Sequence, residues 1–387
     1  LYGWMQIFIA NTGSQASLAV ALAGFLNVLT GGSFNTTYFS FNVLSYAIPF
    51  GTLQIIALLS IAVLTLVNCA AVVVSGYVAT VLTVVKIALV LLIGVGAFLA
   101  SDGGWDNFAL ANVGGACEGV SDAARYGIAG FGAAMLGALW GYDGWNNLTL
   151  VAGEVKNPQR NIPLALIGGM LVIITLYVFI NIAYFYVLTP TEVANIPAPP
   201  QSTVATEAAK QFLGPVAVSL IAAALLASSV GSLHTSILTG ARVPYAMSRD
   251  GMLIPSLSRL SKSTRVPVGA LIMQGSWAGV LTLSGSFDTL TNYVVFGSWI
   301  FYGLTTASVF LFRRRMPHAE RPYKAWGYPV VPILFLLVTA FLLINTLLTT
   351  PVQALIGLGL IALGLPVYWY FSKRGLVNIS QESPYGN

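Results

Sequence analysis

Residues 138–163 read "ALWGYDGWNNLTLVAGEVKNPQRNIP", and the first part of this stretch interrupts an apolar segment with glycines, amides and a carboxylate. Gly141 and Gly144 flank Tyr142 and Asp143, so we expect a helix entering this stretch to unwind there. Unwound backbone at membrane depth leaves N–H and C=O groups without partners, and it is tolerated where it lines a polar site. The stretch therefore predicts a broken membrane helix built around such a site.

The composition of the chain excludes a soluble protein. Its 387 residues are 57% hydrophobic and 7% charged, with a mean hydropathy of +0.82. Soluble domains carry about 25% charged residues. The chain contains repeated apolar runs of about 20 residues, the length a helix needs to cross a bilayer. The short alternating segments of a membrane β-barrel do not dominate. We therefore predict an all-α polytopic membrane protein.

Hydropathy and the placement of glycines, prolines and charges divide the chain into spans and connections. The connection at residues 30–50 is polar and glycine-rich, and "TEAAKQFLG" (206–214) is expected to form a short surface helix. We predict ten spans, at 1–29, 51–73, 79–100, 127–151, 163–188, 215–246, 267–286, 289–312, 328–349 and 352–371.

Charge predicts the orientation of these spans. Most Lys and Arg residues follow the fourth, sixth, eighth and tenth spans, which all lie on one side, whereas the opposite connections are mainly acidic. Cytoplasmic connections are enriched in Lys and Arg. We therefore expect a multi-pass protein of the plasma (inner) membrane with both ends of this chain cytoplasmic. The net charge of +5 belongs to this pattern, so no nucleic acid partner is expected.

Cysteine and histidine are scarce. Cys69 and Cys117 are too few for a disulfide framework and are interpreted as ordinary thiols. His234 and His318 have no Cys or second His at ligand spacing, so neither a metal site nor a cofactor is predicted.

The break itself has two interpretations. In one, glycines kink the helix and Asp143 caps its neighbours without any ligand. In the other, the carbonyl end of the first half-helix attracts an ammonium group and the N–H end of the second attracts a carboxylate. An intramembrane carboxylate is rare and usually functional, which favours the second interpretation. A zwitterion would suit such a site.

Three stretches resemble one transporter family. "ALWGYDGWNNLTLVAGEVKNPQRNIPLAL" resembles the sixth helix and following loop of the amino acid–polyamine–organocation (APC) superfamily, L-amino-acid transporter branch, bacterial type. "SLHTSILTGARVPYAMSRDGMLIPSL" resembles its eighth helix, and "FRRRMPHAERPYKAWGYPVVPILF" the junction of its tenth and eleventh helices. The similarity in order and spacing extends over essentially the whole chain.

The resemblance implies a leucine-transporter-like inverted-repeat fold in a single transmembrane domain, residues 1–387. It assigns 1–100 to family helices three to five, 127–312 to helices six to ten and 328–371 to two additional C-terminal helices. The family's first two helices, which include a glycine-serine-glycine break that holds the substrate carboxylate, have no counterpart after Leu1. The chain is therefore expected to contain about ten of the family's twelve helices, either as a natural truncation or as a fragment.

The resemblance also implies roles around the break. The carbonyls from Leu139 to Gly141 would receive the substrate ammonium, and Trp140 would close over the substrate. Residues Tyr142 to Gly144 would form the unwound link, and Trp145 and Asn146 would start the second half-helix. Asp143 would either add a preference for cationic substrates or hold the break through hydrogen bonds.

Lys86 is the basic residue deepest inside a predicted span. Its ammonium could extend to the interface. By resemblance, it could instead replace the sodium ion of related transporters as a fixed charge, or carry a proton.

Two other spans carry polar residues. Ser232 and His234 belong to a polar face of the span at 215–246, where most hydroxyls are expected to bond to the preceding turn of their own helix. By resemblance, His234 lies near the substrate side chain and Ser298 is able to face the pocket.

These observations and the resemblance predict a secondary amino acid transporter, and they favour a sodium-independent exchanger of neutral L-amino acids that works by alternating access. The alternatives are a proton-coupled symporter, a non-transporting amino acid sensor and an intramembrane hydrolase using Asp143 and His234. The hydrolase lacks a paired carboxylate, a nucleophile motif and a metal triad, so no enzyme is predicted. Residues 30–50 contain no cysteine, so no disulfide-linked heavy chain is expected. The expected partners are an amino acid substrate and the lipid bilayer.

Overall fold

The computed structural model of the chain describes residues 1–43, 46–70, 72–111, 120–121, 124–197, 202–283, 287–321 and 323–373. Cys117, one of the two predicted thiols, lies outside the described residues. Cys69 is half-buried and free.

The predicted spans coincide with apolar helices, and the prediction of an all-α polytopic protein is confirmed. Within the described residues, eight helices are long and apolar enough to cross a membrane, and Ile128–Tyr142 and Val268–Thr282 are shorter apolar helices. These ten elements correspond one to one with the ten predicted spans. The α-helix is the form that satisfies every backbone group within one segment, which hydrocarbon requires.

The first five spans contain these elements: α1 (Tyr2–Met5), η1 (Gln6–Ala10), α2 (Asn11–Leu29), α3 (Thr52–Ala70), α4 (Val72–Ala100), α5 (Ile128–Tyr142), α6 (Asn147–Leu150) and α7 (Pro158–Val187). The last five contain α10 (Val216–Gly240), α11 (Arg242–Arg249), α12 (Val268–Thr282), α13 (Phe287–Arg315), α14 (Val330–Thr349), α15 (Pro351–Ala362) and α16 (Gly364–Lys373). Short turns and surface helices are η2 (Trp105–Ala109), η3 (Ala152–Glu154), α8 (Pro190–Ala194), α9 (Val204–Leu213) and η4 (Pro255–Ser258).

Two predicted connections differ from the structure. Residues 74–78 were expected outside a helix, whereas α4 already begins at Val72. A glycine such as Gly76 destabilises a helix by about 1 kcal/mol relative to alanine. Leaving backbone N–H and C=O groups without hydrogen bonds in lipid costs more. The polar connection at 30–50 contains a hairpin of β1 (Thr37–Val43) and β2 (Tyr46–Gly51), paired antiparallel. Its Thr, Tyr and Phe residues favour strands.

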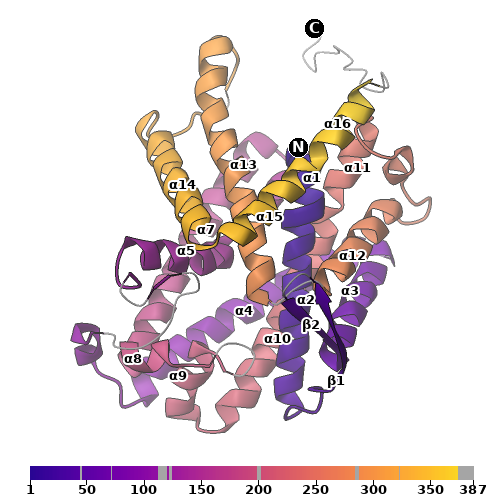
Figure 1. Cartoon of the computed structure of the whole chain (residues 1–387). Coiled ribbons are helices and arrows are strands. Elements are labelled where there is room, and N and C mark those ends of the chain that lie inside the picture. Colours follow the sequence, from indigo (N-terminus) through magenta and orange to yellow (C-terminus); the bar gives the residue numbers. More distant parts are fainter. Residues whose placement is uncertain are drawn as a thin grey trace.

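Helix α2 lies at the centre of the molecule. It packs against α3, α10, α12 and α13 (Figure 1). Around it, α4 packs against α7 and α9, while α13 packs against α5, α14 and α15. Helices α2, α3, α10 and α12 share one buried apolar cluster and together form the α2–α3–α10–α12 unit. Helices α5, α13 and α14 share another apolar cluster.

The first span contains a π-helical turn, η1. A π turn shifts the hydrogen-bond ladder and frees carbonyl groups. Here the Thr12 hydroxyl donates to Ile7 O at 2.8 Å, and the Trp277 indole donates to Phe8 O at 2.9 Å. Side chains from within the span and from α12 therefore satisfy this irregularity.

The connection after α7 holds two short helices. Helix α8 starts with a capping box, in which Thr189 and Glu192 exchange hydrogen bonds. The backbone and side-chain hydrogen bonds from Thr189 hold the pKa of Glu192 below its usual value. The helix predicted from residues 206–214 is present as α9.

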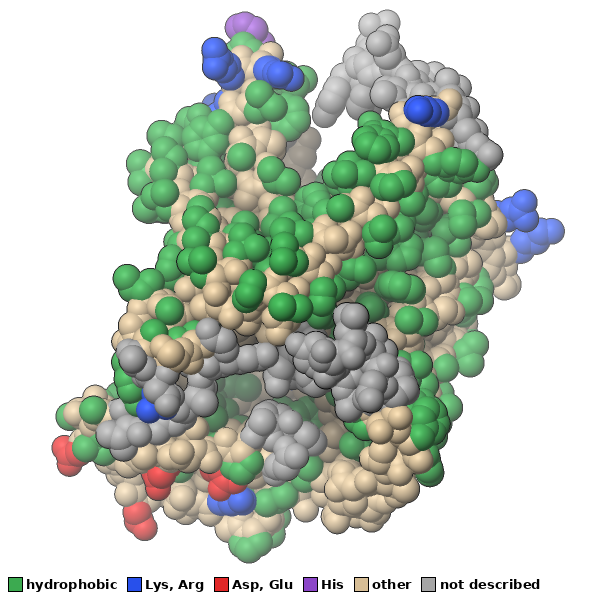
Figure 2. Space-filling view, viewed as in Figure 1, with side chains coloured by type: hydrophobic (Ala, Val, Ile, Leu, Met, Phe, Trp, Pro, Cys, Tyr) green, Lys and Arg blue, Asp and Glu red, His purple; other side chains and the backbone are tan. Residues whose placement is uncertain are grey.

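Charge divides the visible face of the molecule. Figure 2 shows Lys and Arg side chains mainly at the top of the view, and Asp and Glu side chains at the bottom. The N-terminus and α16 lie in the upper half of the same view (Figure 1).

Candidate functional site

The interruption predicted within residues 127–151 is present. Helix α5 ends at Tyr142, and α6 begins at Asn147. Asp143 has extended backbone (φ −66°, ψ 155°), and Gly144 has φ +96°, a conformation that favours glycine. The non-helical link is therefore Asp143–Asn146, longer than the expected Tyr142–Gly144 and displaced towards the C-terminus.

The second half-helix is much shorter than expected. Trp145 and Asn146 were predicted to start it, but they lie in the turn before α6, which has four residues and is followed by the 3-10 turn η3. Gly153 and Pro158 follow closely and discourage a longer helix. A helix this short has little dipole, so the predicted carboxylate site at its N-terminus is not supported.

The end of α5 presents backbone carbonyls at the break. Trp140 O accepts the Asp143 N–H at 3.0 Å, and Gly141 O accepts the Tyr177 hydroxyl from α7 at 2.8 Å. Each carbonyl oxygen has two lone pairs, so both keep the capacity to accept another donor. Gly141 is exposed, which leaves its carbonyl accessible.

Asp143 is tied to α13. The Tyr302 hydroxyl donates to Asp143 Oδ1 at 2.9 Å, and the Trp145 ring lies 5.6 Å from the Tyr302 ring. Ser298 lies one helical turn before Tyr302 and is almost fully buried. The structure therefore places three predicted residues, Asp143, Trp145 and Ser298, around one tyrosine.

Leu139 and Trp140 have a packing role in this structure. Both contact the buried cluster of Leu136, Val295 and Leu342, which joins α5 to α13 and α14. The role of Trp140 in closing over a substrate stays a prediction.

Lys86 and Ser232 form a direct pair. The Lys86 ammonium donates to Ser232 Oγ at 2.7 Å, joining α4 to α10. Lys86 is partly exposed, and the oxygen that accepts from its ammonium is a neutral hydroxyl. Helix α10 also packs against α6, which brings this pair's helix next to the break.

His234 has a different environment. Its Nδ1 lies 3.1 Å from the Asn68 amide nitrogen of α3, and its side chain is 4% exposed. The hydrogen-bond partner of its ring is therefore on α3 rather than in the break. Thr235 and Thr239, by contrast, donate to carbonyls one turn earlier in α10, as predicted for this polar face.

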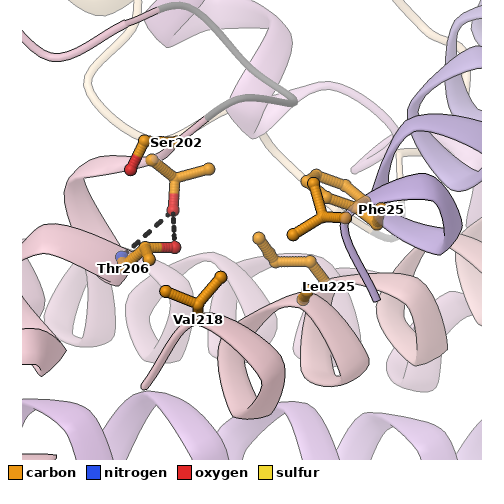
Figure 3. Close-up of a pocket in the computed structure, with 8 residues that line it drawn as sticks. Phe25, Ser202, Thr206, Val218 and Leu225 are labelled. Carbon is orange, nitrogen blue, oxygen red and sulfur yellow. Dashed lines mark hydrogen bonds between the residues drawn. The ribbon is translucent and has the colours of Figure 1, made fainter. Parts of the chain in front are cut away.

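A small outer groove contains none of the predicted site residues. It is lined by residues of α2, α9 and α10 and by those just before α9, including Phe25, Thr206 and Leu225 (Figure 3). Thr203, one of the lining residues, caps α9 by accepting the Thr206 N–H at 3.1 Å. Its walls are mainly apolar, so we place the candidate site at the break instead.

Sequence reasoning missed three residues: Tyr302, Tyr177 and Asn68. Each is a polar side chain inside an apolar run, and that signal was available in the sequence. The identity of its partner was not, because each partner lies on another helix.

The chain resembles known amino acid transporters over nearly its full length. The amino acid permease family model matches residues 1–370. The chain belongs to this family. This chain is 30% identical to the serine/threonine exchanger SteT of Bacillus subtilis over 377 residues, which cover 97% of this chain and 78% of SteT.

Animal relatives are similar over shorter shares of their length. The b(0,+)-type amino acid transporter 1 of Rattus norvegicus is 30% identical over 290 residues, 74% of this chain and 56% of that protein. The large neutral amino acids transporter small subunit 2 of Oryctolagus cuniculus is 28% identical over 377 residues, which cover 95% of this chain and 64% of that protein. This chain thus spans less than two thirds of the length of these two animal relatives. The family consists of transporters, so the predictions of an APC member and of a non-enzyme are confirmed.

Proposed function

We propose that this permease is a sodium-independent exchanger of neutral L-amino acids that works by alternating access. The break at Asp143–Asn146 supports this proposal most. It places the exposed Gly141 and the 42% exposed Trp145 at a point where membrane backbone is unwound. Carbonyls at the C-terminal end of a helix carry partial negative charge and attract an ammonium group. The similarity to SteT, a serine/threonine exchanger, favours small neutral substrates.

The substrate carboxylate needs a separate partner. Helix α6 is too short to supply it through its dipole. We place that partner outside α5 and α6, so the break binds the ammonium end of the amino acid.

Lys86 supports sodium independence. Its ammonium donates to Ser232 Oγ and occupies the space between α4 and α10 with a fixed positive charge. A second cation about 4 Å away would be repelled by about 4 kcal/mol at an effective dielectric constant of 20. The fixed ammonium therefore replaces a coupling cation in our proposal.

Asp143 holds the break in this proposal. Its Oδ1 is already engaged by the Tyr302 hydroxyl, which connects the link to α13. We therefore assign the carboxylate to positioning the break, and exchange of L-arginine tests the cation-preference alternative.

The proposed topology follows the charge distribution. The basic connections face the cytoplasm of a plasma membrane, together with both ends of this chain. Residues 1–100, 127–312 and 328–371 correspond to family helices three to five, six to ten and the two C-terminal additions. No disulfide-linked partner is proposed, since residues 30–50 contain no cysteine.

Counterflow in proteoliposomes tests this function. We expect uptake of labelled L-serine only when unlabelled L-serine or L-threonine is inside, at an equal rate in sodium and in choline buffers. Excess L-arginine should not compete. Empty vesicles should accumulate nothing.

The runner-up is a proton-coupled symporter in which Lys86 or Asp143 carries the proton. It predicts uptake into empty vesicles driven by an acidic exterior, a result that would overturn the exchanger. A sensor would bind L-serine without any counterflow, and this outcome would overturn both transport proposals.

A further inference from the structure

The α2–α3–α10–α12 unit contains a belt of buried polar side chains away from the break. The belt consists of Asn11 and Gln15 on α2, Thr65 and Asn68 on α3, and His234 on α10, all at most 6% exposed. The helices that carry these residues pack together around the central helix α2 (Figure 1).

Contacts between side chains and backbone connect the belt across the helices. The Gln15 amide nitrogen donates to Ser236 O at 3.3 Å, and Asn68 Nδ2 lies beside His234. Asn11 lies against Gly240 of α10, one turn after Ser236. Thr65 Oγ1 lies against Gly275 of α12. All four helices therefore meet at this belt.

Five polar atoms of the belt have no hydrogen-bond partner among the described residues. They are Asn11 Nδ2, Gln15 Oε1, Thr65 Oγ1, Asn68 Oδ1 and His234 Nε2. Buried polar atoms in folded proteins almost always have partners, because leaving one unpaired costs about 1–3 kcal/mol. Five such atoms in one unit indicate a bound species.

The proton on His234 can be placed. Asn68 Nδ2 faces two carbonyls, Leu64 O at 2.9 Å and His234 O at 3.4 Å, so its amide orientation is fixed with nitrogen on that side. A nitrogen donor beside Nδ1 makes Nδ1 an acceptor. The ring proton is then on Nε2, which becomes a buried N–H donor without a partner.

The unpaired groups require a species that both donates and accepts hydrogen bonds. Asn11 Nδ2 and His234 Nε2–H are donors, Gln15 Oε1 and Asn68 Oδ1 are acceptors, and the Thr65 hydroxyl can be either. A cation requires acceptors alone and an anion requires donors alone. Water accepts and donates, and a buried water typically makes about three hydrogen bonds.

We propose that this polar belt binds ordered water inside the α2–α3–α10–α12 unit. The bound water satisfies the five unpaired atoms and completes the hydrogen bonding between the helices. Because water can exchange partners, the belt keeps its groups satisfied when α10 shifts against α2 and α3. This inference is independent of the transported substrate.

X-ray hydroxyl-radical footprinting of the full chain in lipid nanodiscs tests for this water, since radicals form from bound as well as bulk water. We expect oxidation of His234, although it is 4% exposed. Met5, which is fully buried in another cluster, is the negative control, and the exposed His318 is the positive control. Methionine is the more reactive side chain, so protection of Met5 is a stringent control. Protection of His234 equal to that of Met5 would overturn the proposal.

A matched pair of substitutions provides a second test. Thr65→Val removes an unpaired hydroxyl, whereas Thr282→Val on α12 removes one already bonded to Ala278 O at 2.8 Å. If water binds Thr65, we expect Thr65→Val to lower the Tm by about 2–4 °C more than Thr282→Val does. In a dry belt, Thr65→Val would raise the Tm by removing an unsatisfied group, and that result would also overturn the proposal.

Discussion

The π turn η1 and the break between α5 and α6 are both places where membrane backbone departs from the α-helix, yet they differ in access. In η1, Ile7 and Ile9 are at most 3% exposed, and Thr12 and Trp277 bond the freed carbonyls. In the break, Gly141 is exposed and Trp145 is 42% exposed, and Tyr177 bonds Gly141 O from outside the link.

The difference separates a structural irregularity from a candidate site. A sealed turn offers no room for a ligand, and its side-chain donors serve stability alone. An open break has carbonyl capacity that a mobile ammonium group can reach. Substitutions at the two places should therefore affect different properties, stability at η1 and exchange at the break.

The largest effect is expected for Asp143→Leu. It removes the hydrogen bond from the Tyr302 hydroxyl to the carboxyl group, which ties the link to α13, a loss of about 2 kcal/mol. We expect the initial counterflow rate to fall at least about tenfold, since 1.4 kcal/mol corresponds to a factor of ten. Asp143→Asn retains an acceptor and should keep most of the rate. If the Asp143→Leu variant exchanged L-serine at the wild-type rate, Asp143 would have no role in the site.

Gly144→Ala should have the next largest effect. A side chain at φ +96° costs about 1–3 kcal/mol, although Asn147 at 3.5 Å leaves space for it. We expect slower exchange and a lower Tm by differential scanning fluorimetry. Gly137→Ala is the matched control, because its added Cβ meets open space without a positive φ. Equal behaviour of the two variants would argue against a strained link.

At η1, Trp277→Phe should reduce stability without changing transport. It removes the indole donor to Phe8 O inside the protein, and we expect a loss of about 1 kcal/mol in the free energy of unfolding. Exchange per folded molecule should equal that of the wild type. Loss of exchange at an unchanged Tm would place η1 in the transport path.

Tyr177→Phe should have the smallest effect. It removes the donor to Gly141 O but keeps a ring beside Tyr142, whose centroid is 4.8 Å from that of Tyr177. Water can replace the hydroxyl at an exposed carbonyl, so we expect a loss below about 1 kcal/mol. A decrease in Tm as large as that of Trp277→Phe would mean that the break is as sealed as η1.

Much of the fold could be predicted because membrane spans are encoded locally. Each apolar run identifies a helix, and Gly141, Asp143 and Gly144 together indicate where one helix stops. The hairpin after α2 was missed because strand-forming residues such as Tyr38 and Phe39 were outweighed by the neighbouring glycines. The start of the second half-helix was placed too early, because nothing in the local sequence shows that Trp145 and Asn146 belong to the turn before it.

The site was less predictable because its contacts join distant residues. Asp143 and Tyr302 are separated by 159 positions, and Lys86 and Ser232 by 146. Helical periodicity reports which face of one helix is polar, but not which helix it meets. Lys86 and Ser232 were separate candidates in the sequence, and the structure brought them together.

The most direct test of a ligand-binding break is a cryo-EM structure of the full chain with L-serine bound in nanodiscs. We predict density for the amino acid against the carbonyls at the end of α5, with its ammonium group nearest Gly141 O and with Asp143–Asn146 still unwound. Density for L-serine at a place remote from this link, or a continuous helix from α5 into α6, would contradict the account.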